Sequence, residues 1–307
     1  MKKIKNVSLI GLGAIGSAYG SKLHDTLQDS FRVVVDQTRL DTYKKHGVRV
    51  NDQAYPFHYI TPETNTSPAD LVLFAVKNAE LPQAIEAMRQ HIGEDTIILS
   101  LLNGISSEEI IYAATKNEHI LPSMAVEIDA VRAQHNTQLS TYGRIEYGDP
   151  DYPLSEDVLS VKALFETAGI AYKISENITK TMWWKFMINV GINQTSAVLK
   201  APYGVFQRLP HAYEWVEAAM REVVVLSQHA GIHLTEADIK AFRPVIDNLS
   251  PQGKTSMLQD VEAGRKTEVA YFAGKVCELG EKYQVSTPIN EQLYQLITIM
   301  EDMATLK

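Results

Sequence analysis

The stretch Val7-Ser8-Leu9-Ile10-Gly11-Leu12-Gly13-Ala14-Ile15-Gly16 decides the fold of the N-terminal half. Its first four residues form an apolar strand pattern, and a helical pattern follows the glycines. Gly11 permits a tight turn, Gly13 lets a backbone approach a pyrophosphate, and Gly16 lets a helix pack closely on a strand. The first turn of the helix offers free N–H groups and a partial positive charge. The positions predicted to contact a dinucleotide are Gly11, Gly13, Ala14, Ile15 and Gly16.

A carboxylate follows the second apolar run, Arg32 to Val35, at the distance that a dinucleotide-binding unit requires. This residue is Asp36. A carboxylate there accepts hydrogen bonds from the adenosine ribose and repels a 2′-phosphate, so Asp36 favours NAD(H). Arg39 lies three residues on and could instead bind the 2′-phosphate of NADP(H). An aspartate that merely caps a turn would have the same pattern, so both cofactors stay open.

The remainder of the N-terminal half alternates apolar runs with helical patterns, which is typical of βαβ units and a parallel sheet. The expected strands are 4–10, 32–36, 71–76, 96–101 and 119–126. The segment 138–148 alternates like one further strand, a helix is expected over 155–168, and 169–174 follows it. We expect 138–148 and 169–174 to form a mixed edge of the same sheet.

After about residue 174 the apolar residues recur at helical spacing, and no further strand is expected. Asn177 is a candidate N-cap for a helix that ends at about Leu199, before Pro202 and Gly204. Further helices are expected over 210–230, 236–246, 256–263, 267–282 and 290–303. The sequence therefore predicts an α/β chain with a Rossmann NAD(P)-binding domain over 1–174. An all-helical domain for substrate binding and dimerisation is expected over 175–307.

Composition excludes several classes of partner. The 307 residues carry a net charge of −8 with no basic run, which argues against nucleic acid. The lone cysteine, Cys277, and the scattered histidines offer no metal site. No apolar run is long enough for a membrane span, and no secretory signal is visible, so we expect a cytoplasmic protein.

One apolar helix carries three polar residues on a single face. Lys185, Asn189 and Asn193 have i, i+4, i+8 spacing, which on a regular α-helix places them within an arc of about 80°. Buried polar groups need partners, and a small polar ligand would supply them. A desolvated lysine can act as a general acid and attract an anion. The alternative is a structural lysine with two amides bonded to backbone.

Several motifs together resemble those of ketopantoate reductases, also called 2-dehydropantoate 2-reductases. Besides the glycine loop and the lysine stripe, the matching motifs are Val76-Lys77, Leu102-Asn103-Gly104, Ser256-Met257-Leu258-Gln259-Asp260 and Arg265-Lys266-Thr267-Glu268. They occur in the family's order and span nearly the whole chain. The resemblance implies NAD(P)H-dependent reduction of ketopantoate to pantoate, a step toward coenzyme A, and a homodimer as in many relatives.

The resemblance also implies roles for single residues. Lys185 would protonate the developing alkoxide, and Glu268 would bond to Lys185 or to a substrate hydroxyl. Asn103 would lie near the nicotinamide ribose and the substrate, and Lys77 near the cofactor. The substrate-binding set is Asn103, Lys185, Asn189, Asn193, Ser256 and Glu268. Taken singly, Ser256 could cap a helix, Glu268 could be a solvated first-turn acid, and Asp260 is expected to make a structural bond to the segment between the domains.

The chain departs from the family at two substrate-contact positions, where Gly253 and Tyr203 replace asparagines. Many members also use NADPH, whereas Asp36 favours NADH. The first alternative is therefore an NAD-dependent D-2-hydroxyacid dehydrogenase on the same fold, acting on branched or aromatic 2-oxo acids such as that of mandelate. A second alternative is a nucleotide-sensing protein without catalysis, although Lys185, Asn103 and Glu268 are all present.

Overall fold

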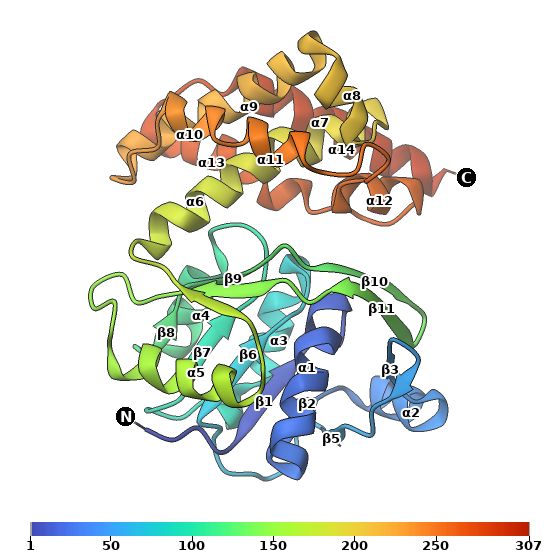
Figure 1. Ribbon diagram of the computed structural model, residues 1–307, viewed down its shortest axis with the longest axis vertical. Coiled ribbons are helices and arrows are strands. Elements are labelled where there is room, and N and C mark those ends of the chain that lie inside the picture. Colours follow the sequence, from blue (N-terminus) through green and yellow to red (C-terminus); the bar gives the residue numbers. More distant parts are fainter. Residues whose placement is uncertain (1, 307) are drawn as a thin grey trace. The chain divides into compact units, whose positions relative to one another are not determined.

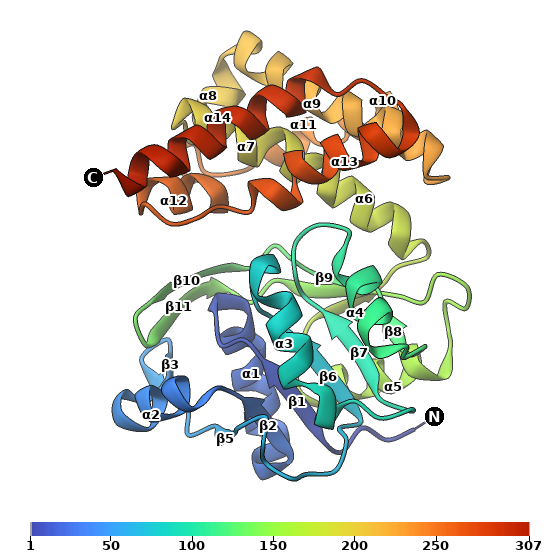
Figure 2. The same cartoon turned by 180° about the vertical axis from the view of Figure 1, so that it is seen from behind.

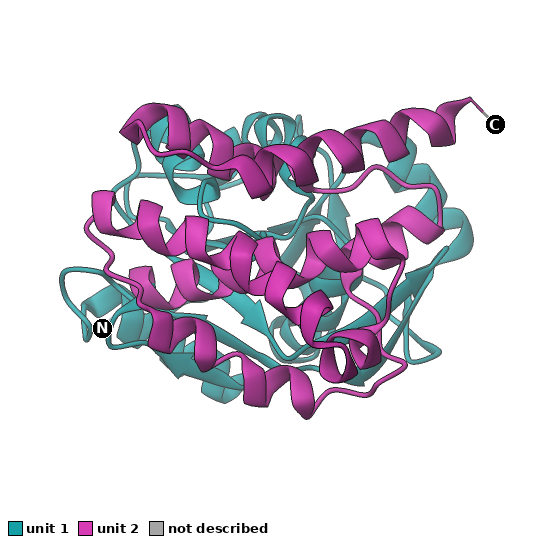
Figure 3. Ribbon diagram, turned by 90° about the horizontal axis from the view of Figure 1, so that it is seen from above, with its two compact units in different colours: residues 1–178 teal, residues 179–307 magenta. Residues whose placement is uncertain are grey.

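The computed structural model describes residues 2–306 and divides into two compact units, residues 1–178 and 179–307 (Figure 3). The N-terminal unit is an α/β structure, and the C-terminal unit is helical, which confirms the predicted fold class. Strand β13 ends at Ile174 and helix α6 begins at Ile178. Within residues 2–306, no helix has the length and apolar character needed to span a membrane.

The N-terminal unit is built on a six-stranded, all-parallel sheet (Figure 1). In spatial order its strands are β5 (His58–Ile60), β2 (Phe31–Val34), β1 (Val7–Ile10), β6 (Leu71–Phe74), β7 (Ile97–Ser100) and β8 (Ile120–Leu121). Every residue of the four central strands is buried, as expected for a parallel sheet covered on both faces. The chain runs outward from β1 on one side and returns to start again at β6, so the order of strands reverses between these two neighbours.

Two apolar cores cover the two faces of this sheet. Successive residues of β1 separate between them: Leu9 belongs to one core and Ile10 to the other. The helices on the Leu9 side are α1 (Ala14–Leu27) and α5 (Glu156–Thr167), and those on the Ile10 side are α3 (Leu81–Ala87) and α4 (Ser107–Thr115). Ser155 caps α5 by accepting a hydrogen bond from the Val158 N–H.

The expected mixed edge of the main sheet is wrong, because the later strands form two small sheets of their own. One has the order β10 (Asp129–Ala133), β11 (Asn136–Thr141), β3 (Arg49–Val50) and β4 (Gln53–Ala54). The other has the order β13 (Tyr172–Ile174), β12 (Arg144–Tyr147) and β9 (Ser123–Val126).

Two residues explain why single expected strands divide. Gly143 has φ +56°, and a Cβ there would lie 2.1 Å from the Val126 carbonyl oxygen, so the chain turns between β11 and β12. Pro122 lacks an N–H and separates β8 from β9 within the expected strand 119–126. Alternation of apolar residues continued through both breaks and concealed them.

The C-terminal unit consists of helices, seen from both sides in Figures 1 and 2. They are α6 (Ile178–Ile188), α7 (Gln194–Leu199), α8 (Tyr203–Arg208), α9 (Pro210–His229), α10 (Glu236–Lys240), α11 (Arg243–Asp247), α12 (Ser256–Glu262), α13 (Ala273–Tyr283) and α14 (Pro288–Thr305). The expected helix 236–246 is two helices, because Pro244 lies in the first turn of α11 and cannot continue α10. The expected helix 267–282 begins late, after a 3₁₀ turn at Val269–Tyr271.

Candidate active site

The glycine loop joins β1 to α1 and has the geometry that its sequence predicts. Gly11 has φ +99°, and a Cβ there would lie 2.5 Å from the Ala75 carbonyl oxygen. A Cβ at Gly16 would lie 1.8 Å from the Gly11 carbonyl oxygen. Gly13 differs, because it is exposed and a Cβ there would lie 3.9 Å from the Ala75 carbonyl oxygen. Protein packing therefore requires glycine at positions 11 and 16, whereas the bare backbone at Gly13 leaves room for a ligand.

The N-terminus of α1 suits an anion. Gly13 is the N-cap and supplies no side-chain hydrogen bond, and the first turn, which contains Ala14 and Ile15, has no acidic residue. The N–H groups of that turn and the positive end of the helix dipole favour a phosphate oxygen. These features fit the pyrophosphate of a dinucleotide.

Three predicted residues follow neighbouring strands at the same edge of the sheet. Gly11 follows β1, Lys77 follows β6 and Asn103 follows β7. The last residues of these strands, Ile10, Phe74 and Ser100, are aligned by their register. Parallel sheets bind ligands beyond their carboxyl ends, where the strand order reverses.

Sequence reasoning missed Asn78, which joins two of these loops. It is buried, and its Nδ2 donates to the Asn103 carbonyl at 2.9 Å. Asn103 is half-buried, and Gly104 after it has φ +100°, so the loop turns sharply there. An amide directly after Lys77, at the end of a strand, was the available signal.

Asp36 caps helix α2 (Gln37–His46). Its Oδ1 accepts a hydrogen bond from the Arg39 N–H at 2.7 Å, and its Oδ2 lies 3.5 Å from the Arg39 guanidinium. Arg39 also donates to Glu80 at 3.2 Å. The side chain of Asp36 is 55% exposed, so its carboxylate meets solvent although one oxygen caps the helix and the other faces Arg39. Arg39 lies between two carboxylates, and both carboxylates repel a 2′-phosphate. Arg39 is therefore poorly suited to bind that phosphate.

A buried carboxyl group lies in the first turn of α4, soon after Asn103. Burial raises the pKa of Glu108 to about 7, against the opposing effect of hydrogen bonds that include one from Ser107. The Ser107 hydroxyl donates to Glu108 Oε2 at 2.9 Å, and Oε1 is buried without a hydrogen-bond partner. Sequence reasoning did not single out this residue, because an acid in a first helical turn is ordinary.

Glu108 should make stability depend on pH. Its pKa is raised from 4.5 to about 7 in the folded protein, so its contribution is fully present below pH 4.5 and is lost as the pH rises through 7. We expect the free energy of unfolding of Glu108→Gln, relative to that of the wild type, to rise by about 3 kcal/mol between pH 5 and pH 8.5. Thermal unfolding of the wild type and of the variant at both pH values measures this change in relative stability. Glu109→Gln, at the exposed neighbouring position, is the control, and an equal pH dependence in both variants would contradict the assignment.

The lysine stripe of the C-terminal unit lies on a helix that is not regular. Helix α6 carries Lys185 and continues through a π turn, Asn189–Asn193, into α7. A π turn closes i→i+5, so four residues rotate the chain by less than on an α-helix. Asn193 therefore lies closer in angle to Lys185 than the 80° arc of a regular helix predicts. Asn193 Nδ2 lies 3.4 Å from Asn189 Oδ1, so the two amides are adjacent.

The three polar side chains of this stripe differ in exposure. Asn193 is buried, whereas Lys185 and Asn189 are half-buried. Trp184 anchors α6 in its unit by donating from Nε1 to the Asp238 carbonyl at 2.9 Å. The stripe thus holds one ammonium group and two amides on one face of a fixed helix, which together can bind an anionic, oxygen-rich molecule.

Ser256 does not cap its helix, contrary to the simple structural alternative. The N-cap of α12 is Thr255, whose hydroxyl accepts from the Leu258 N–H at 3.1 Å. Ser256 is exposed at the first position of that helix. Its hydroxyl therefore has no capping role, in keeping with a role in ligand binding.

The two acids that the sequence analysis singled out, Asp260 and Glu268, follow Ser256 in the same unit. Asp260 pairs with Arg265 at 2.7 Å, five residues along the chain, so it fixes the local loop. Glu268 is half-buried and is the N-cap residue of the 3₁₀ turn Val269–Tyr271, rather than a solvated acid in the first turn of a long helix.

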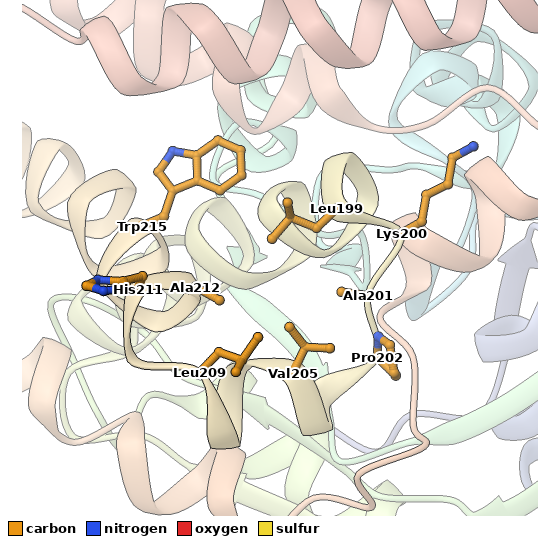
Figure 4. A pocket seen from close by; sticks show the side chains of 9 residues that line it. All are labelled: Leu199, Lys200, Ala201, Pro202, Val205, Leu209, His211, Ala212 and Trp215. Carbon is orange, nitrogen blue, oxygen red and sulfur yellow. The ribbon is translucent and has the colours of Figure 1, made fainter.

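A separate apolar groove of about 610 Å³ lies at α7, α8 and the start of α9 (Figure 4). Its lining includes Leu199, Val205, Leu209 and Trp215, with Lys200 and His211 among the polar residues. None of the predicted site residues lines it. The groove is therefore distinct from the lysine stripe.

Known proteins match both halves of the chain. Residues 7–152 match the family model "Ketopantoate reductase PanE/ApbA", and residues 177–301 match the model of its C-terminal part. A 2-dehydropantoate 2-reductase of Streptococcus pyogenes is 25% identical over 305 residues, which cover 98% of this chain and 99% of the relative.

Two solved structures share the fold. A ternary complex of D-mandelate dehydrogenase with NADH and anilino(oxo)acetate has TM-score 0.86 at 22% identity and covers 98% of this chain and 100% of its own. A dimeric ketopantoate reductase from Staphylococcus aureus has TM-score 0.81 at 18% identity, with 97% and 99% covered. At these identities the likeness concerns the fold alone. The glycine loop, the parallel sheet, the helical second unit and both family models agree, and the chain belongs to the ketopantoate reductase family of NAD(P)-dependent oxidoreductases.

Proposed function

We propose that this chain reduces a 2-oxo acid with a nicotinamide cofactor, and that the acid is ketopantoate, giving pantoate for coenzyme A synthesis. The observation that carries the proposal is the stripe of Lys185, Asn189 and Asn193, which the π turn aligns on one helix face. The name of the S. pyogenes relative supports the choice of substrate.

The residues of the glycine loop would hold the cofactor, together with Asp36, Lys77 and Asn103. When bound, the nicotinamide supplies a hydride to the substrate's carbonyl carbon. The Gly13 backbone and the N-terminus of α1 bind the pyrophosphate, and Asp36 binds the adenosine ribose.

Lys185 is the proton donor in this proposal. As the carbonyl carbon becomes tetrahedral, its oxygen gains negative charge, and the ammonium of Lys185 stabilises and protonates it. Glu268 accepts a hydrogen bond from Lys185 or from a substrate hydroxyl. Asn189 and Asn193 donate to the substrate's oxygens, and the Ser256 hydroxyl binds its carboxylate.

We propose NADH as the preferred cofactor, because the Asp36 carboxylate is exposed and Arg39 is flanked by two carboxylates. Asp36→Ser keeps a capping oxygen but loses the charge, so the ratio of kcat/KM with NADPH to that with NADH should rise at least about tenfold. The melting temperature should stay within about 2 °C. Asp36→Ala should raise the same ratio but also destabilise α2 by about 1 kcal/mol. An unchanged ratio in both variants would contradict the assignment.

A specific contact favours the second candidate, a D-2-hydroxyacid dehydrogenase. Gly253 and Tyr203, the two departures from the family, touch: a Cβ at 253 would lie 3.0 Å from the Tyr203 ring. The Gly253 carbonyl also accepts from the Tyr203 N–H at 3.0 Å. The ring fills the space that a side chain at 253 would need. Two polar positions are thus replaced by one aromatic surface, which suits a branched or aromatic acid.

A panel of 2-oxo acids separates these readings. The purified protein is incubated with NADH or NADPH and with ketopantoate, 2-oxoisovalerate, 2-oxoisocaproate or benzoylformate, and absorbance loss is followed. We expect the highest kcat/KM with ketopantoate. Preference for benzoylformate or a simple branched acid would support the second candidate. No turnover with any acid would support a nucleotide-sensing protein instead.

We further propose that the chain forms a homodimer that covers the groove at α7–α9. Leu199 is 46% and Leu209 is 56% exposed, so two large apolar side chains that line the same groove meet solvent. The dimeric S. aureus structure supports a dimer, and the exposed leucines are the reason for placing its interface at this groove.

Charge placed in the groove should dissociate such a dimer. We expect Leu209→Asp to convert the protein to a monomer, measured by light scattering after size-exclusion chromatography, because the carboxylate would be buried without a partner. Val131→Asp, at a 51% exposed apolar position of the N-terminal unit, is the matched control and should remain dimeric. A dimer that survives Leu209→Asp would place the interface elsewhere.

A further inference from the structure

Gln194, the first residue of α7, is fully buried and uses its side-chain amide completely. Its Nε2 donates to the Val190 carbonyl at 2.7 Å and to Asn290 Oδ1 at 3.2 Å. Its Oε1 accepts from the Ala273 N–H at 2.8 Å. Both N–H donors and the carbonyl oxygen thus have protein partners, so the amide is held in one orientation.

The first of these partners lies within the π turn. Val190 is between Asn189 and Asn193, and its carbonyl accepts the shortest of the three bonds. Widening a helical turn disturbs the i→i+4 ladder, and the affected carbonyls need other donors. The Thr195 hydroxyl supplies a second donor, to the Gly191 carbonyl at 2.8 Å. Side chains that follow the turn therefore satisfy two consecutive carbonyls inside it.

The partner of Oε1 lies at the start of α13. Ala273 is the first residue of that helix, and its N-cap Phe272 supplies no side-chain hydrogen bond. Gln194 takes the place of that cap. The 3₁₀ turn that leads into Ala273 begins directly after Glu268. One side chain thus links the turn bearing the substrate amides to the segment that follows the proposed partner of Lys185.

The third partner of Gln194 is Asn290, which residues of α9 hold in place. Asn290 is fully buried, and its Nδ2 donates to Glu222 Oε2 at 2.7 Å and to the Ala219 carbonyl at 3.2 Å. These bonds tie Gln194 to α14 and α9. On another side of the turn, Gly191 packs so closely on α9 that a Cβ would lie 2.7 Å from Met220 Cγ.

We infer that Gln194 is a positioning residue for the reaction: it holds the π turn open and so sets the direction of Asn193 relative to Asn189 and Lys185. Relaxation of the turn to a regular α-helix would return Asn193 to about 80° from Lys185 around the helix axis. Asn193 would then lie at the far end of that arc and no longer in line with Lys185. The inference rests on the proposed function, because it assigns Gln194 a role in that reaction.

The test uses Gln194→Met, which keeps the shape of the side chain and removes all three bonds. We expect kcat/KM for the 2-oxo acid to fall about 100-fold, through a lower kcat and a higher KM, while the Kd of NADH changes less than twofold. Thr195→Val is a milder second variant, which is used in case Gln194→Met folds poorly. Its kcat/KM should fall about fivefold. Gln228→Met is the matched control, because Gln228 also donates to the carbonyl four residues earlier, but on the regular helix α9.

Two further readouts separate positioning from a general loss of stability. In a Lys185→Ala background, Gln194→Met should lower the residual rate less than threefold, because the aligned face no longer contains the proton donor. Hydrogen exchange should quicken in peptides covering residues 189–195 and 272–276.

Equal loss with and without Lys185, unchanged exchange in those peptides, or kcat/KM within threefold of the wild type would overturn the inference. A wild-type protein that reduces no 2-oxo acid would instead overturn the proposed function and this role with it. The two failures are therefore distinguishable in the wild-type assay.

Discussion

Lys185→Ala is expected to lower kcat for the 2-oxo acid by about 10²–10⁴-fold, the range that a general acid contributes. The alkoxide would form without a nearby proton donor and without a compensating charge. The Kd of NADH should change less than twofold, because the proposed cofactor residues belong to the N-terminal unit. Steady-state kinetics and fluorescence titration with NADH measure the two quantities.

The control for this substitution lies on the same helix. Lys180 of α6 is 40% exposed and pairs with Asp238 at 3.6 Å, so Lys180→Ala removes the same charge from the same helix. Lys180→Ala should keep kcat within about twofold, because Lys180 has no role in the proposed reaction. The variant should also remain folded, since an exposed ion pair contributes at most about 1 kcal/mol to stability. If Lys185→Ala and Lys180→Ala retain the same activity, Lys185 is not the proton donor.

Two glycines of the loop should respond in opposite ways to the same substitution. Gly16→Ala places a Cβ 1.8 Å from the Gly11 carbonyl oxygen, so α1 must move away from the loop. We expect the melting temperature to fall by about 10 °C or more. Gly13→Ala meets no protein atom closer than 3.9 Å and keeps φ −70°, so the melting temperature should stay within about 2 °C.

Gly13→Ala, which should leave the melting temperature almost unchanged, should weaken cofactor binding strongly. The added methyl group would stand where the pyrophosphate approaches the backbone, so the Kd of NADH should rise at least about tenfold in a protein that remains fully folded. Calorimetric titration and thermal unfolding of the two variants measure both effects. Unchanged NADH affinity in Gly13→Ala would show that the pyrophosphate does not lie against this residue.

The positions of the proposed cofactor residues in the fold could be predicted from the sequence, because their signals are local. A strand, three glycines and a helix stand in one continuous stretch, and the order of strands then places Lys77 and Asn103 at the same edge. The cap that Asp36 forms on α2 was also among the readings of its sequence pattern.

The geometry of the lysine helix could not be predicted in the same way. Spacing alone gave a regular helix, whereas the π turn depends on partners distant in sequence: Ala273, Asn290 and the α9 surface facing Gly191. The strand 138–148 was divided for a similar reason, since the Gly143 turn fits against the Val126 carbonyl. Long-range contacts, which periodicity does not record, decided both.

The burial of Glu108 and the contact between Tyr203 and Gly253 are likewise tertiary. Neither residue type predicts its surroundings: a first-turn glutamate is usually solvated, and a glycine usually marks a turn. In the structure, burial raises the pKa of Glu108 to about 7, and Gly253 lies against the Tyr203 ring.

The most direct test of the central claim follows the hydride itself. The purified protein is incubated with ketopantoate and with NADH that carries deuterium at C4 of the nicotinamide, prepared in each stereochemical form, and the product is analysed by mass spectrometry. We expect pantoate that carries one deuterium at C2 with one of the two forms. Absence of pantoate, or pantoate without deuterium from either form, would contradict the claim.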